Sequence, residues 1–440
     1  SMNSLFRFTS SKISIETGIA TFTYEIEHNN EHFTFTETLH FPTENKIEPN
    51  SPLLKVVLDN LHLMLGISYY KLFCPKIIET PNILLTEEQA VFWNKVYTKG
   101  LGEFFYKNKI DFKNLINFPF TKDAAVQTFS QNTAHRSLLF FGGGKDSVVS
   151  AELLKKANKP FTILMVNTSQ VQEQSATLVG ANSIVIKRQI DQQIFDLNKR
   201  QDVYNGHVPA TAIWNFIGLL TAIIYDYKYI IGSNEHSANY GNVTYLGEEI
   251  NHQWSKSFEF ETMFQDYVKK FITPSIMYFS LLRPFSEIKI VEMFSKYPQY
   301  FPYFSSCNKN FAIINPQTKT RWCCACPKCL FVFITLAAFL PKEEVIKIFG
   351  KNLLADNSLL ELLQELLGVK NIKPFECVGT PQEVQYALLK ISKLGEYKED
   401  ALLQYAEKEI LPKLNEEILK NIVLIKDQQQ AIPSEFKEII

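Results

Sequence analysis

Apolar and polar residues alternate along the first forty positions of the chain, which is the pattern of β-strands with one buried face. The stretches Thr21-Phe22-Thr23-Tyr24-Glu25-Ile26 and His32-Phe33-Thr34-Phe35-Thr36 show this period of two clearly. Asn29 and Asn30 lie between them, where a turn is expected. Apolar residues then recur with helical spacing over residues 53–65 and 87–105. We therefore predict that residues 1–125 form an N-terminal α+β domain.

From residue 126 the pattern changes to short, continuous apolar runs separated by helix-like sequence. The runs cover residues 137–141, 161–166, 184–186 and 229–231, and a helical pattern follows the first of them at 146–156. Alternating strands and helices predict a parallel, doubly wound α/β sheet that is covered on both faces. We assign it to residues 126–345. Beyond it, helical patterns such as 359–367 and 401–414 predict a helical C-terminal region, residues 346–440.

Composition and charge restrict the classes of function. The 440 residues are 46% hydrophobic, enough for two or three domains. Lys and Arg together number 45 against 46 Asp and Glu, so no long-range field attracts a nucleic-acid backbone, and we expect no nucleic-acid partner. No apolar stretch is long enough to span a bilayer, and the N-terminus lacks the pattern of a secretory signal. We expect a soluble, cytoplasmic protein with no membrane partner.

Three glycines end the first buried run, in the sequence Phe141-Gly142-Gly143-Gly144-Lys145-Asp146-Ser147. Glycines let backbone amides approach an anion closely, and the following helix presents its positive end to it. Lys145 and Ser147 add a charge and a hydroxyl, and Asp146 can bind a Mg²⁺ that bridges phosphate oxygens. The spacing differs from GxxxxGK(S/T) and from GxGxxG. It resembles the SGGxDS loop of PP-loop ATP pyrophosphatases, with Gly142 replacing the usual serine. The alternative is a purely structural glycine turn.

Two further segments are similar to PP-loop proteins. Asn167 follows the second buried run, at a strand end that borders the adenosine in that family. Val208-Pro209-Ala210-Thr211, and then Gly232-Ser233-Asn234 after the fourth run, resemble the VPxR helix and GxN strand end of deazaguanine-nitrile synthases. Thr211 stands where those enzymes have arginine, so their phosphate contacts do not carry over. The resemblance implies an adenine nucleotide alpha hydrolase-like fold, with Gly232 and Asn234 near the nucleotide.

Four of the seven cysteines have the spacing of a metal site. Cys323, Cys326 and Cys329 follow C-x₂-C-x₂-C, and Cys307 lies upstream. Four thiolates from two short loops suit a structural, tetrahedral zinc site. Free buried cysteines, or a redox pair at the adjacent Cys323 and Cys324, are the alternatives.

The glycine loop, Cys326-Pro327-Lys328-Cys329-Leu330-Phe331 and Pro374-Phe375-Glu376-Cys377-Val378-Gly379 together resemble the MurL family, over most of the chain. Members are UDP-N-acetylmuramoyl-L-alanyl-L-glutamate epimerases. The resemblance implies inversion of a terminal L-glutamate on a peptidoglycan precursor, with ATP and Mg²⁺, after a ligase has added the L-glutamate. In this interpretation the carboxylate is activated as an acyl-adenylate, AMP and pyrophosphate are released, and Lys145 stabilises charge on the α-phosphate.

The groups that transfer the proton are less well defined by the sequence. Glu235 and His236 follow a predicted strand end, where open α/β sheets bind ligands. His207 and the pair Glu376-Cys377 are further candidates, because imidazoles and thiols suit α-proton transfer. Two other functions stay open: adenylation of a nucleobase or tRNA for amidation or thiolation, and a nucleotide-binding module without turnover.

Overall fold

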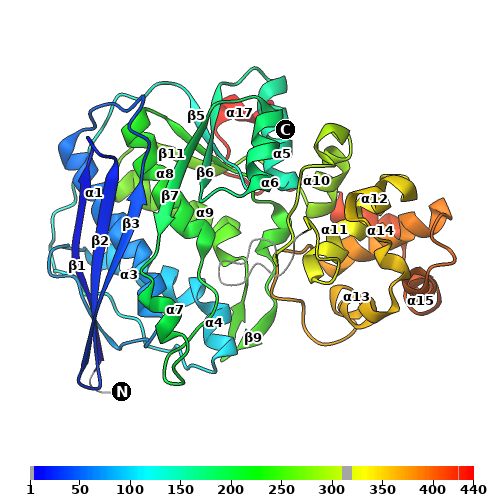
Figure 1. The fold of residues 1–440 in the computed structure, drawn as a ribbon, viewed down its shortest axis with the longest axis horizontal. Helices are drawn as coiled ribbons and strands as arrows, with labels where there is room; N and C mark the ends of the chain where they lie inside the picture. The colour runs from blue at the N-terminus through cyan, green and yellow to red at the C-terminus, as the bar shows by residue number, and fades with distance from the viewer. Residues whose placement is uncertain (1–3, 310–319, 425) are drawn as a thin grey trace.

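The computed structural model describes residues 4–309, 320–424 and 426–440. One nine-stranded sheet, in the order β11-β8-β5-β6-β7-β3-β2-β1-β4, runs through the larger part of the molecule (Figure 1). Its strands are β1 (Ser4–Ser14), β2 (Ile19–His28), β3 (Glu31–His40), β4 (Ile77–Glu79), β5 (Ser137–Phe140), β6 (Phe161–Val166), β7 (Ser183–Gln189), β8 (Tyr229–Gly232) and β11 (Met277–Ser280). A separate hairpin is formed by β9 (Val243–Tyr245) and β10 (Glu248–Ile250).

The strands from β11 to β7 are all parallel, as predicted. The chain begins this part at β5, continues through β6 and β7 on one side, and then returns to place β8 and β11 on the other side. The direction of winding therefore reverses between β5 and β8. Crevices at the carboxyl ends of the strands on either side of such a reversal are the usual ligand sites of open α/β sheets.

The N-terminal strands form an antiparallel meander with alternating burial, which confirms the predicted period of two. Asn29 and Asn30 form the turn, both with positive φ. The strands do not form a sheet of their own, however. Thr38 to His40 of β3 pair antiparallel with Lys187 to Gln189 of β7, so that the meander extends the central sheet. This pairing covers two strand edges that would otherwise expose unpaired amides and carbonyls. The division at residue 125 stays a prediction.

Helices cover both faces of the sheet, and they divide the apolar interior into two cores. Neighbouring residues of one strand point into different cores, as Leu138 and Leu139 of β5 do. One face is covered by α1 (Ser51–Leu65), α3 (Glu87–Gly100), α8 (Ala210–Tyr225) and α9 (Phe258–Phe271), and the other by α5 (Lys145–Lys156), α6 (Gln170–Val179) and α10 (Glu287–Phe294). Short helices add to them: α2 (Ile67–Tyr70), α4 (Gly102–Lys107), α7 (Gln193–Leu197) and α17 (Ser434–Lys437).

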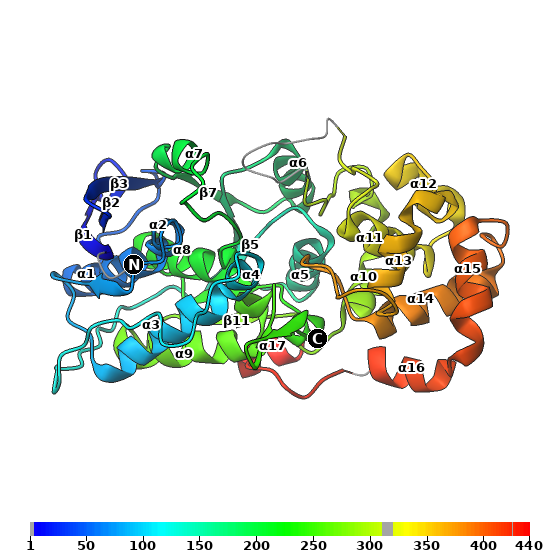
Figure 2. The same ribbon diagram turned by 90° about the horizontal axis from the view of Figure 1, so that it is seen from below.

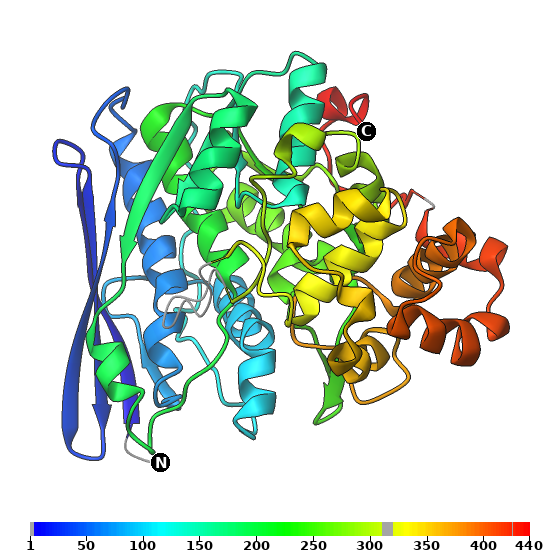
Figure 3. The ribbon, with the colours of Figure 1, turned by 45° about the vertical axis from the view of Figure 1, so that its right-hand side comes forward.

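The C-terminal helices gather at the end of the molecule opposite the meander (Figures 2 and 3). They are α11 (Pro327–Ala337), α12 (Lys342–Phe349), α13 (Leu360–Leu366), α14 (Pro381–Leu394), α15 (Ala401–Glu409) and α16 (Glu416–Val423). The helix predicted over 401–414 ends at Glu409, and a 3-10 turn follows at Leu411–Lys413, because Pro412 has no amide proton for an α-helical bond. No helix within the described ranges is both long and apolar enough to cross a membrane.

Candidate active site

The glycine loop lies between β5 and α5, at the carboxyl edge of the sheet. Gly143 has φ +77°, and a Cβ there would lie 3.0 Å from Cα of Gln172, so that both conformation and space require glycine. At Gly142, by contrast, a Cβ would have no described atom within 4 Å. Gly144 is the N-cap of α5, and no side chain of the described residues caps it. Ser147 donates its hydroxyl to the Gly144 carbonyl at 3.2 Å. The first turn of α5 therefore keeps amides that can bind an anion.

Three carboxylates meet beside this loop. Oxygens of Asp146, Glu235 and Glu287 all lie within 4.8 Å of one another. They come from the start of α5, the segment after β8 and the start of α10. The buried ammonium of Lys145 lies 2.7 Å from Oδ1 of Asp146 and 2.5 Å from Oε2 of Glu287. Lys328 of α11 lies 3.8 Å from the other oxygen of Glu287. Asp146 and Glu235, which the sequence marked as candidates separately, lie together here, and their roles stay predictions.

The environment shifts the pKa values of Glu287 and Glu235 in opposite directions. Burial opposes ionisation of Glu287, but Lys145 and then Lys328 outweigh it and lower its pKa to about 2. Burial, followed by the charges of Glu287 and Asp146, raises the pKa of Glu235 well above its ordinary value. The pKa of Lys145 is raised, because the two carboxylates outweigh its burial. Hard oxygen ligands beside an anion site are the donor set of a magnesium–phosphate complex.

Arg283 fixes the position of Glu235. Its buried guanidinium donates to the Glu235 carbonyl at 2.9 Å and to Oε2 of Glu261 at 3.0 Å. The same segment leads, four residues later, to Glu287, whose helix is capped by Ser286. The stretch 282–288 therefore supports one acidic residue and supplies another.

The other predicted nucleotide contacts are already engaged within the protein. Asn167 has φ +52°, and its amide side chain pairs with the backbone of Arg188. Gly232 ends β8, where a Cβ would lie 2.7 Å from the hydroxyl of Tyr278. Asn234 donates to that hydroxyl at 2.9 Å. Their contact with a nucleotide stays a prediction.

The structure does not bring His236 into the carboxylate cluster. Its Nδ1 lies 2.6 Å from Oδ2 of Asp427, and its Nε2 lies 3.4 Å from the hydroxyl of Tyr240. Glu376 accepts a hydrogen bond from the amide of Lys328 at 2.9 Å, near the start of α11. A catalytic role for His236 stays a prediction, but its imidazole faces the C-terminal tail.

The four predicted metal-binding cysteines converge. The sulfur atoms of Cys307, Cys323, Cys326 and Cys329 all lie within 4.8 Å of one another. Cys323 and Cys329 are 3.7 Å apart, close to the edge of about 3.8 Å that a tetrahedron with Zn–S bonds of about 2.3 Å would have. Amides of Ala325 and Cys329 donate to the sulfurs of Cys323 and Cys326. Cys324 points away, toward the Phe349 carbonyl.

Cys377 lies on the loop between α13 and α14, which reaches from the C-terminal helices toward the sheet (Figure 2). Lys328 donates to its carbonyl, and Nζ of Lys256 lies 3.2 Å from its sulfur. His252 forms a hydrogen bond with the sulfur and has Nδ1 2.5 Å from Oε2 of Glu103. Sequence reasoning missed Lys256, His252 and Glu103, which no local motif marks. Glu287 was missed as well, and Lys328 was overlooked although it lies inside the motif Cys326-Pro327-Lys328-Cys329.

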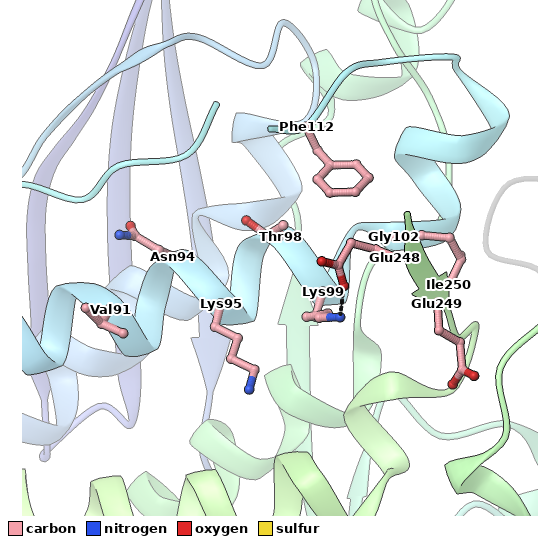
Figure 4. Close-up of a pocket in the computed structure, with 10 residues that line it drawn as sticks. All are labelled: Val91, Asn94, Lys95, Thr98, Lys99, Gly102, Phe112, Glu248, Glu249 and Ile250. Atoms are coloured by element: carbon pink, nitrogen blue, oxygen red, sulfur yellow. Dashed lines mark hydrogen bonds and ion pairs between the residues drawn. The ribbon is translucent and has the colours of Figure 1, made fainter. Parts of the chain in front are cut away.

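A pocket of about 340 Å³ lies on the surface near this region, between α3, α4 and the β9–β10 hairpin (Figure 4). Val91, Phe112 and Ile250 give it apolar walls. Lys99 and Glu248 pair with each other at its rim. It contains none of the carboxylates or thiols described above.

The fold and the site together define an α/β protein with a glycine loop and clustered carboxylates at the switch point of a doubly wound sheet. Family models identify it further. Residues 1–281 match the MurL N-terminal domain and residues 303–420 match the MurL C-terminal domain. The chain belongs to the MurL family, as its motifs predicted.

Curated relatives cover nearly the whole chain. A UDP-N-acetyl-alpha-D-muramoyl-L-alanyl-L-glutamate epimerase of Xanthomonas oryzae pv. oryzae is 37% identical over 414 residues, which are 94% of this chain and 91% of the relative. A protein of the same name from a Micromonospora species is 36% identical over 90% of this chain and 88% of its own. No solved structure gives a significant match.

Proposed function

We propose that this protein inverts the terminal L-glutamate of UDP-N-acetylmuramoyl-L-alanyl-L-glutamate to D-glutamate, at the expense of ATP, in peptidoglycan precursor synthesis. The names of relatives at 36–37% identity over about nine-tenths of the chain support the epimerase activity and the substrate. The observation that carries the ATP-dependent chemistry is the meeting of Asp146, Glu235 and Glu287 beside the glycine loop. A ligase that adds L-glutamate would supply the substrate.

In this proposal the parallel part of the sheet is a PP-loop nucleotide-binding fold. Its support is the loop at residues 142–147, its position after the first strand of the parallel sheet, and the switch point beside it. Amides of the loop and of the first turn of α5 would bind the pyrophosphate part of ATP. The positive φ of Gly143 and the unobstructed backbone at Gly142 both suit close approach of phosphate.

Asp146 and Glu287 would hold Mg²⁺, with Glu235 beside them. When bound, the ion would neutralise phosphate charge and orient the α-phosphate. Lys145 is already held between both carboxylates, so its ammonium is fixed where negative charge would develop. Burial of these groups strengthens their interaction with the triphosphate, because little water screens it.

Adenylation makes the epimerisation chemically accessible. A proton next to a carboxylate resists removal, because the resulting enolate would carry a second negative charge beside the first. An acyl-adenylate has no carboxylate charge, and its ester-like carbonyl withdraws electrons from Cα. Each pKa unit gained at Cα is worth about 1.4 kcal/mol. Removal of the proton, its return to the opposite face and hydrolysis to AMP would complete the inversion.

We also propose that the four converging cysteines hold a structural zinc ion. The sulfur separations suit a tetrahedral site, and the backbone amides that donate to Cys323 and Cys326 would stabilise thiolates. Zinc would join the segment at Cys307 to the start of α11.

The test is to incubate the protein with ATP, Mg²⁺ and the L-Ala-L-Glu muramoyl nucleotide in D₂O, and to measure AMP, glutamate chirality and deuterium at Cα. We expect AMP, D-glutamate and deuterium, all dependent on both substrates. AMP without deuterium would indicate ligation or amidation and would contradict the proposal. Asp146→Asn should abolish AMP formation with the fold intact, whereas the exposed Asp196→Asn should leave it unchanged.

A further inference from the structure

A second, partly buried cluster of charged groups lies beside the carboxylate site and is not used by the adenylation chemistry. Its centre is the sulfur of Cys377, which Nζ of Lys256 approaches to 3.2 Å and to which His252 is hydrogen-bonded. On its other side, His252 has Nδ1 2.5 Å from Oε2 of Glu103, and His207 lies 3.8 Å from the same oxygen. The order thiol, imidazole, carboxylate is that of a nucleophile or base, a proton acceptor and an orienting group.

The surroundings favour a thiolate paired with an imidazolium. Burial opposes ionisation of Cys377, but Lys256 and then His252 outweigh it and lower the thiol's pKa to about 5. Burial likewise opposes protonation of His252, yet its hydrogen bonds with Cys377 and Glu103 raise the pKa of the imidazole to about 9. Burial and the charge of His252 lower the pKa of the neighbouring His207 to about 3. The rings of His207 and His252 lie 4.4 Å apart with their planes tilted by 37°, and the surroundings favour the charged form at His252 and the neutral form at His207.

The thiol cluster and the carboxylate cluster are joined by one side chain. Nζ of Lys328 lies 3.8 Å from Oε1 of Glu287 and donates to the carbonyl of Cys377. Lys145 joins Glu287 in turn to Asp146. The carboxylate cluster and the loop that carries Cys377 are therefore neighbours in the fold.

The cluster is also composed from both parts of the chain. Glu103 and His252 come from the segment that matches the MurL N-terminal domain, and Cys377 comes from the C-terminal match. Cys377 is only partly buried, while Cys74, a thiol remote from it, is buried and has a pKa raised by burial. Exposure together with neighbouring cations is what distinguishes a reactive cysteine from a packed one.

We propose that the sulfur of Cys377 is the base that removes the α-proton of the activated terminal glutamate, with Lys256 and His252 holding it as a thiolate and Glu103 orienting His252. This assignment rests on the proposed function. The C–H bond at Cα breaks and an S–H bond forms, while the electron pair of the C–H bond moves into the acyl carbonyl as an enolate. A proton derived from water returns to the opposite face, and the thiol gives its proton back to solvent.

The experiment separates adenylation from proton transfer. ATP–pyrophosphate exchange, which depends on the muramoyl dipeptide, reports the first step, and deuterium incorporation at Cα in D₂O reports the second. Cys377→Ala should keep pyrophosphate exchange near the wild-type rate and lower deuterium incorporation at least about a hundredfold. Cys377→Ser, which keeps the shape of the side chain, should behave the same way, and Cys74→Ser should match the wild type in both assays.

The role of His252 needs a readout that a merely structural residue would not change. The charged groups that face the sulfur are Lys256, His252, Lys328, Lys373 and Glu376. Alkylation of Cys377 by iodoacetamide, followed by peptide mass spectrometry against pH, should show reaction well below the ordinary pKa of a thiol. His252→Gln removes a cation beside the sulfur, so it should move this profile to higher pH.

Deuterium incorporation at the wild-type rate in both Cys377 variants would overturn the assignment. Loss of pyrophosphate exchange in a folded Cys377→Ser protein would overturn it as well, because the thiol would then act in adenylation. If the wild-type protein shows no exchange with this substrate, the proposed function fails instead. In that case the pH profile of alkylation still tests whether Cys377 is held as a thiolate. A profile with the ordinary pKa of a thiol would refute that part of the proposal.

Discussion

Removing the charge of Glu287 should destabilise the fold measurably, because this carboxylate lies at the centre of a buried ion network. Its side chain is 2% exposed and accepts from Lys145, which is 1% exposed. Lowering its pKa from 4.5 to about 2 corresponds to about 3 kcal/mol of stabilisation at neutral pH. Breaking buried ion pairs by removal of one partner typically costs about 3–5 kcal/mol, which agrees. Glu287→Gln also relieves the repulsion on Glu235, so about 3 kcal/mol is the upper end.

The assay is thermal unfolding of the wild type and Glu287→Gln from pH 7 downward. If the chain unfolds as one unit, about 2.1 cal/mol/K per residue over 440 residues converts about 3 kcal/mol into a Tm lowered by about 3–4 °C. Because the folded-state pKa is depressed, the stabilisation is complete above pH 4.5 and is lost as the pH falls toward 2. The difference in Tm should therefore shrink below pH 4.5.

The matched control is Glu88→Gln, the same chemical change at an ion pair in which both side chains are more than half exposed. Its Tm should equal that of the wild type, because exposed pairs contribute little. An unchanged Tm in Glu287→Gln, or equal losses in the two variants, would refute the argument that burial makes this pair important.

The remaining predictions concern the loop, the cysteines and the substrate. Gly143→Ala should abolish AMP formation, because residue 143 has a positive φ and the added Cβ would lie 3.0 Å from Cα of Gln172. Gly142→Ser should keep AMP formation, because a Cβ there meets no described atom within 4 Å. Equal activity of the two variants would argue against the role of the loop. Cys323→Ser should lower zinc well below one per chain and lower the Tm, while Cys74→Ser should change neither; wild-type protein without zinc would end that proposal. Lys373 has a buried Nζ with no hydrogen-bond partner among the described residues, and we expect it to anchor the peptide substrate. Lys373→Met should therefore raise KM for the peptide about ten- to a hundredfold and leave KM for ATP unchanged. Equal effects on both KM values would contradict this role.

Local sequence was sufficient to predict those parts of the site that are formed by one continuous segment of the chain. The run from Ser137 to Lys156 predicts strand, glycine loop and helix because each residue acts on its neighbours, and the structure has these elements. The position of Glu235 shortly after a strand end was also predicted, whereas its meeting with Asp146 was not. Convergence of Cys307 with the C-x₂-C-x₂-C segment was predicted from the spacing of the cysteines.

Long-range contacts account for what the sequence did not reveal. The pairing of β3 with β7 joins residues about 150 positions apart, and either strand's alternation would suit several partners. Glu103, His252 and Cys377 are also far apart along the chain, and each alone is more readily explained as a packed residue. Their chemistry exists only after the C-terminal loop has reached the N-terminal part.

The cysteine cluster lies where it can influence the carboxylate site as well as the stability of the fold. Cys326 and Cys329 flank Lys328, whose ammonium lies between Glu287 and the backbone of Cys377. Cys326 caps α11 by accepting from the amide of Cys329, so the same turn that gathers the sulfurs fixes the direction of the lysine. A flexible lysine would lose rotamer freedom on spanning two sites, and a rigid turn reduces that loss. Any group that binds the four sulfurs would therefore also hold the thiol loop against the carboxylates, and would couple the C-terminal helices to the site on the sheet.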